Sequence, residues 1–410
     1  MRSLSAPQAA DILGVSISTL YAYVSRGLLR SLPDGASKRR RYDADEVRLL
    51  ARRRADAKRA GGVAERSLDW GVPVLESRIT QIADGRLYYR GIDALTLAHD
   101  ATLEETAARL WDCAPARLAA ASLASTGFDA AQWSDWARRW AHLAPLERTL
   151  VLLPAAAASL PGRWAPGSDA QLDTAALLLR VTAAALAGVA PRDAPVHRQL
   201  AAAWGIRRRA DADLLRRALV LCADHELNPS TFAVRCIAST GTHLFGAIAG
   251  GLAALSGPRH GGETLRAGAL LDEAAHAADL DRYLAQRLAR DERSEGARTA
   301  LAGFAHPLYP DGDPRARALL DALCTTQPER QPLRAAGALA ARVEAATGLR
   351  PTIDFALAVL ERTLALPAGA AFTLFAAGRT AGWIAHAIEQ YADGKLIRPR
   401  ARYVGSDAPG

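Results

Sequence analysis

The chain has 410 residues, of which 50% are hydrophobic, 23% charged and 6% aromatic. This length is too great for one simple core and predicts two or three folded units, while the hydrophobic share excludes an intrinsically disordered protein. Residues 1–66 hold 14 Lys and Arg against seven Asp and Glu, so they account for nearly all of the net charge of +8. Any negatively charged partner is therefore expected at the N-terminal segment.

Alanine and leucine dominate the sequence and β-branched residues rarely cluster, which predicts an all-α protein. The start lacks the layout of a signal peptide. The most apolar stretches, 150–160 and 175–190, are interrupted by Pro154 and Arg180, so we expect no membrane contact. The cysteines have no metal-ligand spacing and no disulfide-scaffold density, which predicts a cytoplasmic protein with no bound metal and with reduced thiols at Cys113, Cys222, Cys236 and Cys324.

The chain opens with a pattern of two short helices. Ser5 can cap a first helix that carries the apolar residues of 9–13, and Gly14 supplies a turn. A second helix is expected at about Ser18–Ser25, ended by Gly27. Two short helices joined by a glycine-bearing turn are typical of a helix-turn-helix unit.

A turn at 32–35 and a strongly basic stretch follow, which we interpret as a small wing. The segments LSAPQAADILGVSISTLYAYVSRGLL and RRRYDADEV resemble the winged helix-turn-helix domains of the MerR and excisionase type. We therefore expect such a domain over 1–60 and a linker over 61–67. DNA is a possible partner, but the basic surface could equally be solvated or serve in dimerisation. Contacts to DNA phosphate would come from Lys38, Arg39, Arg40 and Arg41.

Four later loops combine glycine or proline with chemically useful side chains, at 225–229, 256–262, 303–315 and 351–354. Asn228 and Asp313 can each cap a helix whose first position is a proline. Arg315 then falls in the first turn, where a cation opposes the helix dipole and requires a compensating anion.

Each of these groups also has a plain structural explanation. A loop histidine is most often structural, Asp354 can be the N-cap of the helix expected over 355–364, and Arg379 can be an ordinary surface arginine. The occurrence of all of them in one chain and in one order nevertheless favours a functional site.

The order of these segments is similar to that of the citrate and 2-methylcitrate synthase family. The resemblance covers 68–405 and implies a helical large domain over 68–260 and 360–410, with a small mobile domain over 261–359 between its two parts. The motifs that carry it are LESRITQIADGRLYYRGIDALTLA, HELNPSTFAVR, ALSGPRHGG, GFAHPLYPDGDPRA, PTIDF, GRTAGWIAHAIEQ and LIRPRARYVG.

The resemblance implies a role for each matched residue. Asp354 would remove a proton from the methyl group of acetyl-CoA, His260 would hydrogen-bond the thioester oxygen, and His306 would polarise and protonate the carbonyl of oxaloacetate. Acetyl-CoA or a related acyl-CoA would be a co-substrate, with no tightly bound cofactor. The carboxylates of oxaloacetate would be held by His225, Arg315 and Arg379 and, from the other subunit of an obligatory homodimer, by Arg398.

The reaction requires residues of these types. The proton beside a thioester is too weakly acidic for a carboxylate in water, so a base and a hydrogen-bond donor must act together in a dry site. Dicarboxylates are best held by arginine, because its planar guanidinium binds a carboxylate through two hydrogen bonds. Closure of one domain over the other would exclude water.

One segment departs from the family pattern. Family members often have Arg or Lys a few residues after the third histidine, in contact with coenzyme A phosphate, whereas 308–311 has no cation and contains Asp311. Arg259 stands where an apolar residue is common, so either Arg259 replaces the missing coenzyme A contact or coenzyme A binds weakly. The acyl donor therefore stays open.

Two functions fit the sequence. The first is an acyltransferase that condenses an acyl-CoA with oxaloacetate, in the manner of the tricarboxylic acid cycle enzyme. The second is a DNA-binding regulator that uses the same fold to sense a metabolite. Asp354 favours the first function, because a sensor of oxaloacetate or citrate needs the arginines but not the base.

Overall fold

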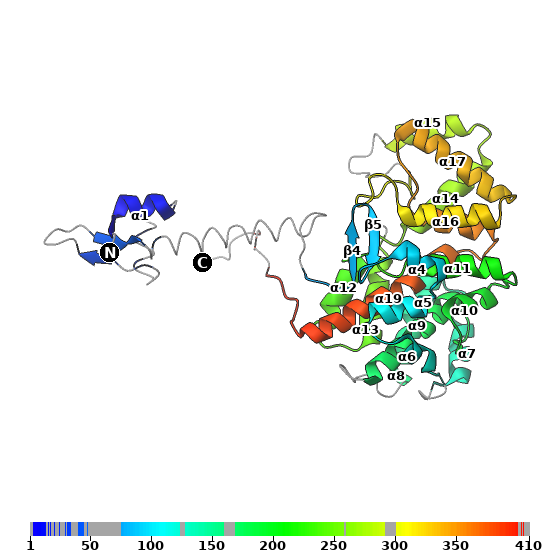
Figure 1. Ribbon diagram of the computed structural model, residues 1–410, viewed down its shortest axis with the longest axis horizontal. Helices are drawn as coiled ribbons and strands as arrows, with labels where there is room; N and C mark the ends of the chain where they lie inside the picture. Colours follow the sequence, from blue (N-terminus) through cyan, green and yellow to red (C-terminus); the bar gives the residue numbers. More distant parts are fainter. Residues whose placement is uncertain are drawn as a thin grey trace. The chain divides into compact units, whose positions relative to one another are not determined.

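The computed structural model describes residues 3–13, 15, 17, 20, 24, 29, 31–33, 40–44, 47, 75–123, 128–159, 169–257, 260–291, 301–400, 403 and 405. The chain divides into two compact units, Met1–Glu76 and Ser77–Gly410 (Figure 1). The expected linker at 61–67 and the cations Lys38 and Arg39 lie outside the described residues.

The first unit combines a helix with a small antiparallel sheet. Its elements are β1 (Ser3–Ser5), α1 (Ala6–Leu13), β2 (Ser31–Pro33) and β3 (Arg40–Asp43), with strand order β1-β3-β2. The Gln8 side chain accepts hydrogen bonds from the backbone and hydroxyl of Ser5 at the start of α1. The pairing of β2 with β3 forms the base of the expected wing. The apolar interior is made by Ala9, Ala10, Leu13, Leu20, Leu29, Tyr42 and Val47.

The second unit begins with a three-stranded antiparallel sheet of β4 (Thr80–Ala83), β5 (Arg86–Tyr89) and β6 (Ile92–Asp93). Asp84 and Gly85 form the first turn and have φ of +51° and +69°. An Asp-Gly pair with left-handed φ at both residues is the usual two-residue hairpin turn. The helical composition of the chain obscured this hairpin, although Asp84-Gly85 was a local signal for it.

The rest of the second unit is helical, as expected. One group of helices comprises α4 (Ala94–Asp100), α5 (Leu103–Leu110), α6 (Pro115–Ala120), α7 (Ala130–Arg139), α8 (Pro145–Ser159), α9 (Asp169–Ala187), α10 (Val196–Ala203), α11 (Arg209–Leu221), α12 (Pro229–Ala238), α13 (Leu244–Leu255) and α19 (Ala370–Asp393). The others are α14 (Glu263–His276), α15 (Leu280–Asp291), α16 (Pro314–Thr326), α17 (Gln331–Thr347) and α18 (Ile353–Thr363). The first four lie at one end of the unit in Figure 1, and α18 packs against α14, α16 and α17. The small domain expected over 261–359 stays a prediction, and α18 crosses its expected end.

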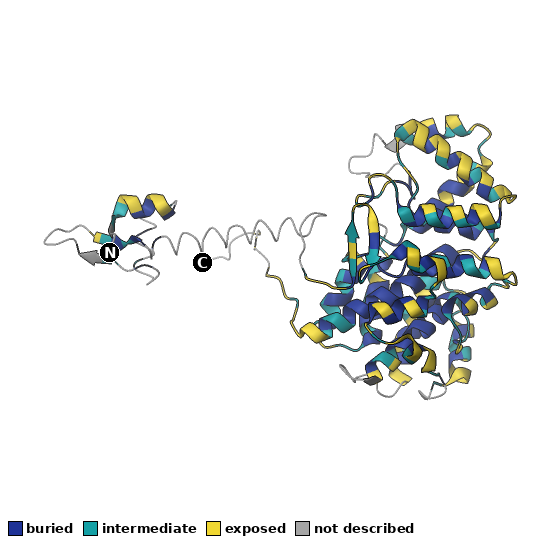
Figure 2. Cartoon of the chain, viewed as in Figure 1, coloured by how far each residue is buried: buried dark blue, intermediate teal, exposed yellow. Residues whose placement is uncertain are grey.

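Helix α19 is the central element of this unit. It contacts α5, α9, α11, α12, α13 and α18 and is buried along most of its length (Figure 2). Gly382 allows the closest approach, because a Cβ atom there would lie 2.2 Å from the Asp224 carboxylate and 2.5 Å from the Ala223 carbonyl oxygen. The Gly382 N–H donates to that carbonyl at 2.9 Å. This approach places α19, and Arg379 on it, directly against the segment that carries His225.

Helix α9 is a second core element. Its window Ala170–Ala187 is long and apolar enough to span a membrane by length and composition, but 72% of it is buried inside the protein. Arg180 in the middle of α9 donates to the carbonyl oxygens of Leu118 and Ala121. These contacts are those of a core helix of a folded protein.

Candidate active site

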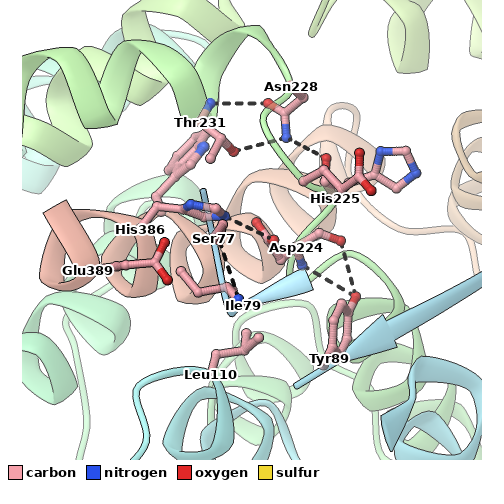
Figure 3. Close-up of polar contacts among 12 residues, drawn as sticks. Ser77, Ile79, Tyr89, Leu110, Asp224, His225, Asn228, Thr231, His386 and Glu389 are labelled. Carbon is pink, nitrogen blue, oxygen red and sulfur yellow. Dashed lines mark hydrogen bonds and ion pairs between the residues drawn. The ribbon is translucent and has the colours of Figure 1, made fainter. Parts of the chain in front are cut away.

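The segment before α12 holds the first expected histidine. Asn228 caps α12 by accepting the Thr231 N–H at 3.2 Å, as predicted, and Pro229 takes the first helical position. The carboxylate of Asp224, beside His225, lies 3.2 Å from His386 on α19, while the Asp224 backbone contacts the Tyr89 hydroxyl (Figure 3). Buried contacts from a sheet and from α19 thus hold His225 in place.

The pKa values of the neighbouring Asp224 and His225 are both lowered, for different reasons. Burial alone would raise the pKa of Asp224, but the charges of His386 and Arg379 hold it below its ordinary value. Burial, together with the charge of Arg315, lowers the pKa of His225 well below its usual range. Asp224 is therefore an anion and His225 a neutral imidazole at neutral pH.

His260 is oriented by two residues that the sequence did not reveal as parts of the site. Its Nε2 lies 2.8 Å from the Ser230 hydroxyl, which also receives a hydrogen bond from the Trp383 indole at 3.2 Å. Burial lowers the pKa of His260 to about 4, so the ring is neutral. The Ser230 hydroxyl has one proton, which can be donated to His260 or to Asn228 Oδ1 at 2.7 Å. Donation to His260 leaves the ring proton on Nδ1.

His306 is also neutral, because burial lowers its pKa to about 4 with a further contribution from Arg315. The backbone N–H of Leu308 donates to His306 Nδ1 at 3.2 Å. The ring proton is therefore on Nε2, which makes that nitrogen a hydrogen-bond donor. The centroids of the His306 and His225 rings are 5.1 Å apart.

Arg315 meets its required anion within its own turn. Asp313 caps α16 as predicted, and its carboxylate accepts from Arg315 Nε at 2.9 Å and from Nη2 at 2.8 Å. The same carboxylate accepts the Ile353 N–H at 2.9 Å, so it also fixes the start of α18. Both charged side chains are buried.

Asp354 is not the N-cap of α18. Thr352 occupies that position, and Asp354 lies in the first turn with a partly buried side chain. The Thr264 hydroxyl donates to Asp354 Oδ1 at 2.7 Å. Burial raises the pKa of Asp354 to about 6, and the nearby charge of Glu263 acts in the same direction. A carboxylate with a raised pKa is a better proton acceptor than an ordinary aspartate.

Arg379 is a core residue rather than a surface one, with 2% of its area exposed. Its Nε donates to the Cys222 carbonyl at 3.0 Å, and its guanidinium lies 4.8 Å from the centre of the Phe375 ring. It has no ion pair with any described residue, unlike Arg315. Its charge is therefore the better placed of the two to receive a ligand carboxylate.

A chain of contacts links these groups. His225 reaches His306 by ring contact, Asp313 links Arg315 to the first turn of α18 with Asp354, and the Ser230–Trp383 pair links His260 to the helix of Arg379. Arg398 is exposed in the extended segment after α19, and Arg259 lies outside the described residues.

Three residues that pattern reasoning missed also contact the site: Ser230, Thr264 and Tyr309. Each lies within five residues of a matched residue, which was the only local signal for them. The segment 308–311 has no cation of its own, but the Arg350 side chain donates to the Asp311 carbonyl at 2.6 Å. Among the described residues no cluster of three His, Cys, Asp or Glu could hold a metal ion.

Comparisons with known proteins show the family to which the chain belongs. The family model described as the C-terminal domain of citrate synthase matches residues 67–400. The chain belongs to the citrate synthase family. A second family model, that of the MerR family regulatory proteins, matches residues 8–42.

Individual relatives have moderate sequence identity to this chain. "Citrate synthase 2" of Bacillus subtilis is 32% identical over 200 residues, which are 48% of this chain and 52% of that protein. The chain thus matches about half the length of this curated relative. The crystal structure of citrate synthase from Thermotoga maritima is 28% identical, has a TM-score of 0.68, and aligns over 83% of this chain and 96% of its own. The ternary complex of carboxymethyl coenzyme A and oxaloacetate with the citrate synthase of Thermoplasma acidophilum is 24% identical with the same TM-score and coverage, and shows the shared fold.

The raised pKa of Asp354 predicts a stability effect that does not depend on activity. An aspartate whose pKa is higher in the folded than in the unfolded state loses stability as the pH rises through about 6. Asp354→Asn should therefore raise the melting temperature at pH 7.5, with a smaller gain at pH 4.5, where Asp354 is itself neutral. Asp321→Asn, the same change at an exposed site on α16, is the control. An Asp354→Asn variant that is less stable than the wild type at pH 7.5 would contradict the described environment.

Proposed function

We propose that the protein condenses an acyl-CoA with oxaloacetate and releases a citrate-type product and free CoA. The observation that carries this proposal is the Asp354 carboxylate, whose pKa of about 6 suits a general base, in one network with two neutral histidines and two buried arginines. Membership of the citrate synthase family supports the same reaction.

In this reaction Asp354 takes the proton from the carbon next to the thioester. The charge that develops on the thioester oxygen is met by a hydrogen bond from His260, which requires the proton on Nδ1. This tautomer requires the Ser230 hydroxyl to donate its one proton to His260 Nε2 rather than to Asn228 Oδ1, while the same hydroxyl accepts from the Trp383 indole. A neutral imidazole suits this role because the base and the donor then carry no opposite charges that would pair with each other.

The enol carbon then attacks the carbonyl carbon of oxaloacetate. His306 Nε2–H is the donor that polarises this carbonyl and gives its proton to the forming alkoxide. Water then hydrolyses the thioester of the condensed product, which releases CoA and a free carboxylate. The oxaloacetate carboxylates would be held by Arg379 and Arg315 with His225, and by Arg398 of the partner subunit in a homodimer.

The sensor alternative is weaker because it leaves Asp354 without a purpose. A partly buried carboxylate with a raised pKa costs stability, and a binding protein for a dicarboxylate gains nothing from a second negative charge near its ligand.

Release of CoA thiol from acetyl-CoA, measured with and without oxaloacetate, tests the reaction. Asp354→Asn should lower kcat by about 10²–10⁴-fold, because the amide keeps the shape but cannot accept a proton, while oxaloacetate still binds. Asp321→Asn should turn over at the wild-type rate. Propionyl-CoA in the same assay decides between a citrate and a 2-methylcitrate product. Thiol release by wild type and Asp354→Asn at equal rates would remove Asp354 from the role of base.

A mixing experiment tests the subunit that supplies Arg398. Arg398→Ala and Asp354→Ala proteins should each be nearly inactive. After subunit exchange, half of the dimers are mixed and each retains one intact site, so about a quarter of the wild-type activity should return. Mass spectrometry of tagged subunits verifies the exchange. Verified exchange without recovery would place Arg398 in the site of its own subunit or outside any site.

We further propose that the first unit binds DNA through phosphate contacts. The MerR model matches 8–42, the β2–β3 pair forms a wing, and Arg40 is exposed at the start of β3. Arginines on a wing suit the DNA backbone rather than the base edges.

Affinity for duplex DNA, measured by fluorescence anisotropy at two salt concentrations, tests this proposal. An Arg40→Ala/Arg41→Ala variant should bind more weakly. The slope of its log affinity against log salt concentration should be shallower, by the amount expected for the loss of about two phosphate contacts. Arg198→Ala/Arg207→Ala removes two exposed cations of the second unit and should bind like the wild type. No binding of wild type at low salt would make the unit a protein-contact or assembly module.

A further inference from the structure

Tyr309 contacts three of the predicted substrate-binding and catalytic residues, although no step of the proposed reaction uses it. It is buried, with 2% of its area exposed. Its hydroxyl lies 3.0 Å from His225 Nε2, its ring centroid is 5.0 Å from that of His306, and the Arg315 guanidinium lies 5.3 Å from the ring centre. The Tyr309 side chain thus contacts a residue that lies 84 positions earlier in the sequence.

The local backbone explains how Tyr309 reaches these partners. Its N–H donates to the His306 carbonyl at 2.9 Å, and the Gly312 N–H donates to the Tyr309 carbonyl at 3.0 Å. Two successive turns therefore bring the rings of His306 and Tyr309 to one side. Arg315 lies on the Tyr309 ring as a cation on an aromatic face, which is a favourable contact in a buried setting.

The hydrogen bond to His225 joins two neutral groups, so either the Tyr309 hydroxyl or a protonated Nε2 can be its donor. Burial raises the pKa of Tyr309 to about 12, so its hydroxyl keeps its proton at any working pH. Burial lowers the pKa of His225, so the imidazole is neutral and has one donor and one acceptor nitrogen. With the hydroxyl donating to Nε2, the proton of His225 resides on Nδ1.

We propose that Tyr309 is a positioning residue for oxaloacetate binding: its hydroxyl fixes the orientation and tautomer of His225, and its ring holds His306 and Arg315 at their spacing around the ligand. This inference rests on the proposed function for the identity of the ligand. It assigns Tyr309 no contact with the reacting atoms. The effect of the Tyr309 hydroxyl on the ligand is carried by His225.

Tyr309→Phe removes the hydroxyl and keeps the ring. The variant should bind oxaloacetate about 10-fold more weakly, by calorimetry and by KM, because a buried acceptor loses its donor. The KM for acyl-CoA should stay at the wild-type value, since the contacts of Tyr309 are with the oxaloacetate residues. Tyr391→Phe is the matched control: its hydroxyl donates to the Thr242 carbonyl at 2.6 Å, away from the site residues, and its loss should leave both KM values unchanged.

A double-mutant cycle separates positioning from general stability. If Tyr309 acts through His225, Tyr309→Phe should have little further effect on oxaloacetate affinity in a His225→Ala background. Additive effects, or a wild-type KM for oxaloacetate in Tyr309→Phe, would overturn the inference. If the wild type binds oxaloacetate but releases no CoA, the proposed reaction fails while the cycle still measures the coupling. No binding of oxaloacetate to the wild type would overturn both.

A spectroscopic measurement reads the tautomer of His225 in the wild type itself. With 15N-labelled histidine, the resonances lost in His225→Ala identify this ring. Its Nε2 should be unprotonated and hydrogen-bonded from about pH 6 to pH 8. A protonated Nε2 in that range would overturn the assigned tautomer.

Discussion

The buried ion pair between Asp313 and Arg315 is the interaction on which the rest of the site depends. The Asp313 carboxylate accepts two hydrogen bonds from the Arg315 guanidinium, one from the Arg315 backbone and one from the Ile353 backbone. It therefore caps α16, neutralises a cation at the helix end where a cation is unfavourable, and fixes the first turn of α18. Because removal of one partner from a buried pair costs about 3–5 kcal/mol, this arrangement tolerates little change.

The same fold keeps other charges only partly compensated. Arg379 has a carbonyl and an aromatic ring as neighbours but no ion pair among the described residues. The Asp354 carboxylate accepts one hydrogen bond, from the Thr264 hydroxyl, whereas the Asp313 carboxylate accepts four from N–H groups. The contrast between Asp313 and Asp354 accounts for their opposite pKa shifts, because burial acts to raise the pKa of both but only Asp313 is surrounded by donors. Such under-compensated groups weaken the folded state and retain their capacity to bind a ligand or a proton.

How much of this could be read from the sequence depends on the distance over which each contact acts. Asn228 and Asp313 were predictable as caps because a cap and its helix are neighbours in the chain. The role of Asp354 in the first turn was not, since Thr352 competes for the cap position and the Asp313 contact that fixes the turn comes from 40 residues earlier. The burial of Arg379 could have been inferred from the apolar residues all around α19, which is the pattern of a core helix rather than a surface one.

Contacts between distant segments were beyond pattern reasoning without the family resemblance. The hydrogen bonds of His225 with Tyr309 and of His260 with Ser230 join residues that lie 84 and 30 positions apart, and no local sequence pattern predicts such pairs. The resemblance placed the histidines in one site but could not show which residues fix their tautomers, because a tautomer depends on the donor or acceptor at the far side of the ring. Only the three-dimensional structure shows those partners.

The uneven charge of the chain has a physical consequence for the two units. The matched site residues belong to the second unit, whereas nearly all of the net positive charge lies in residues 1–66. A single small wing with few cations gives weak, salt-sensitive affinity for a nucleic-acid backbone. If the second unit forms the proposed homodimer, two copies of the first unit belong to one particle, and the second contact becomes intramolecular. Dimerisation that completes the catalytic site through Arg398 would then also strengthen DNA binding, so the oligomeric state would link the two proposed functions.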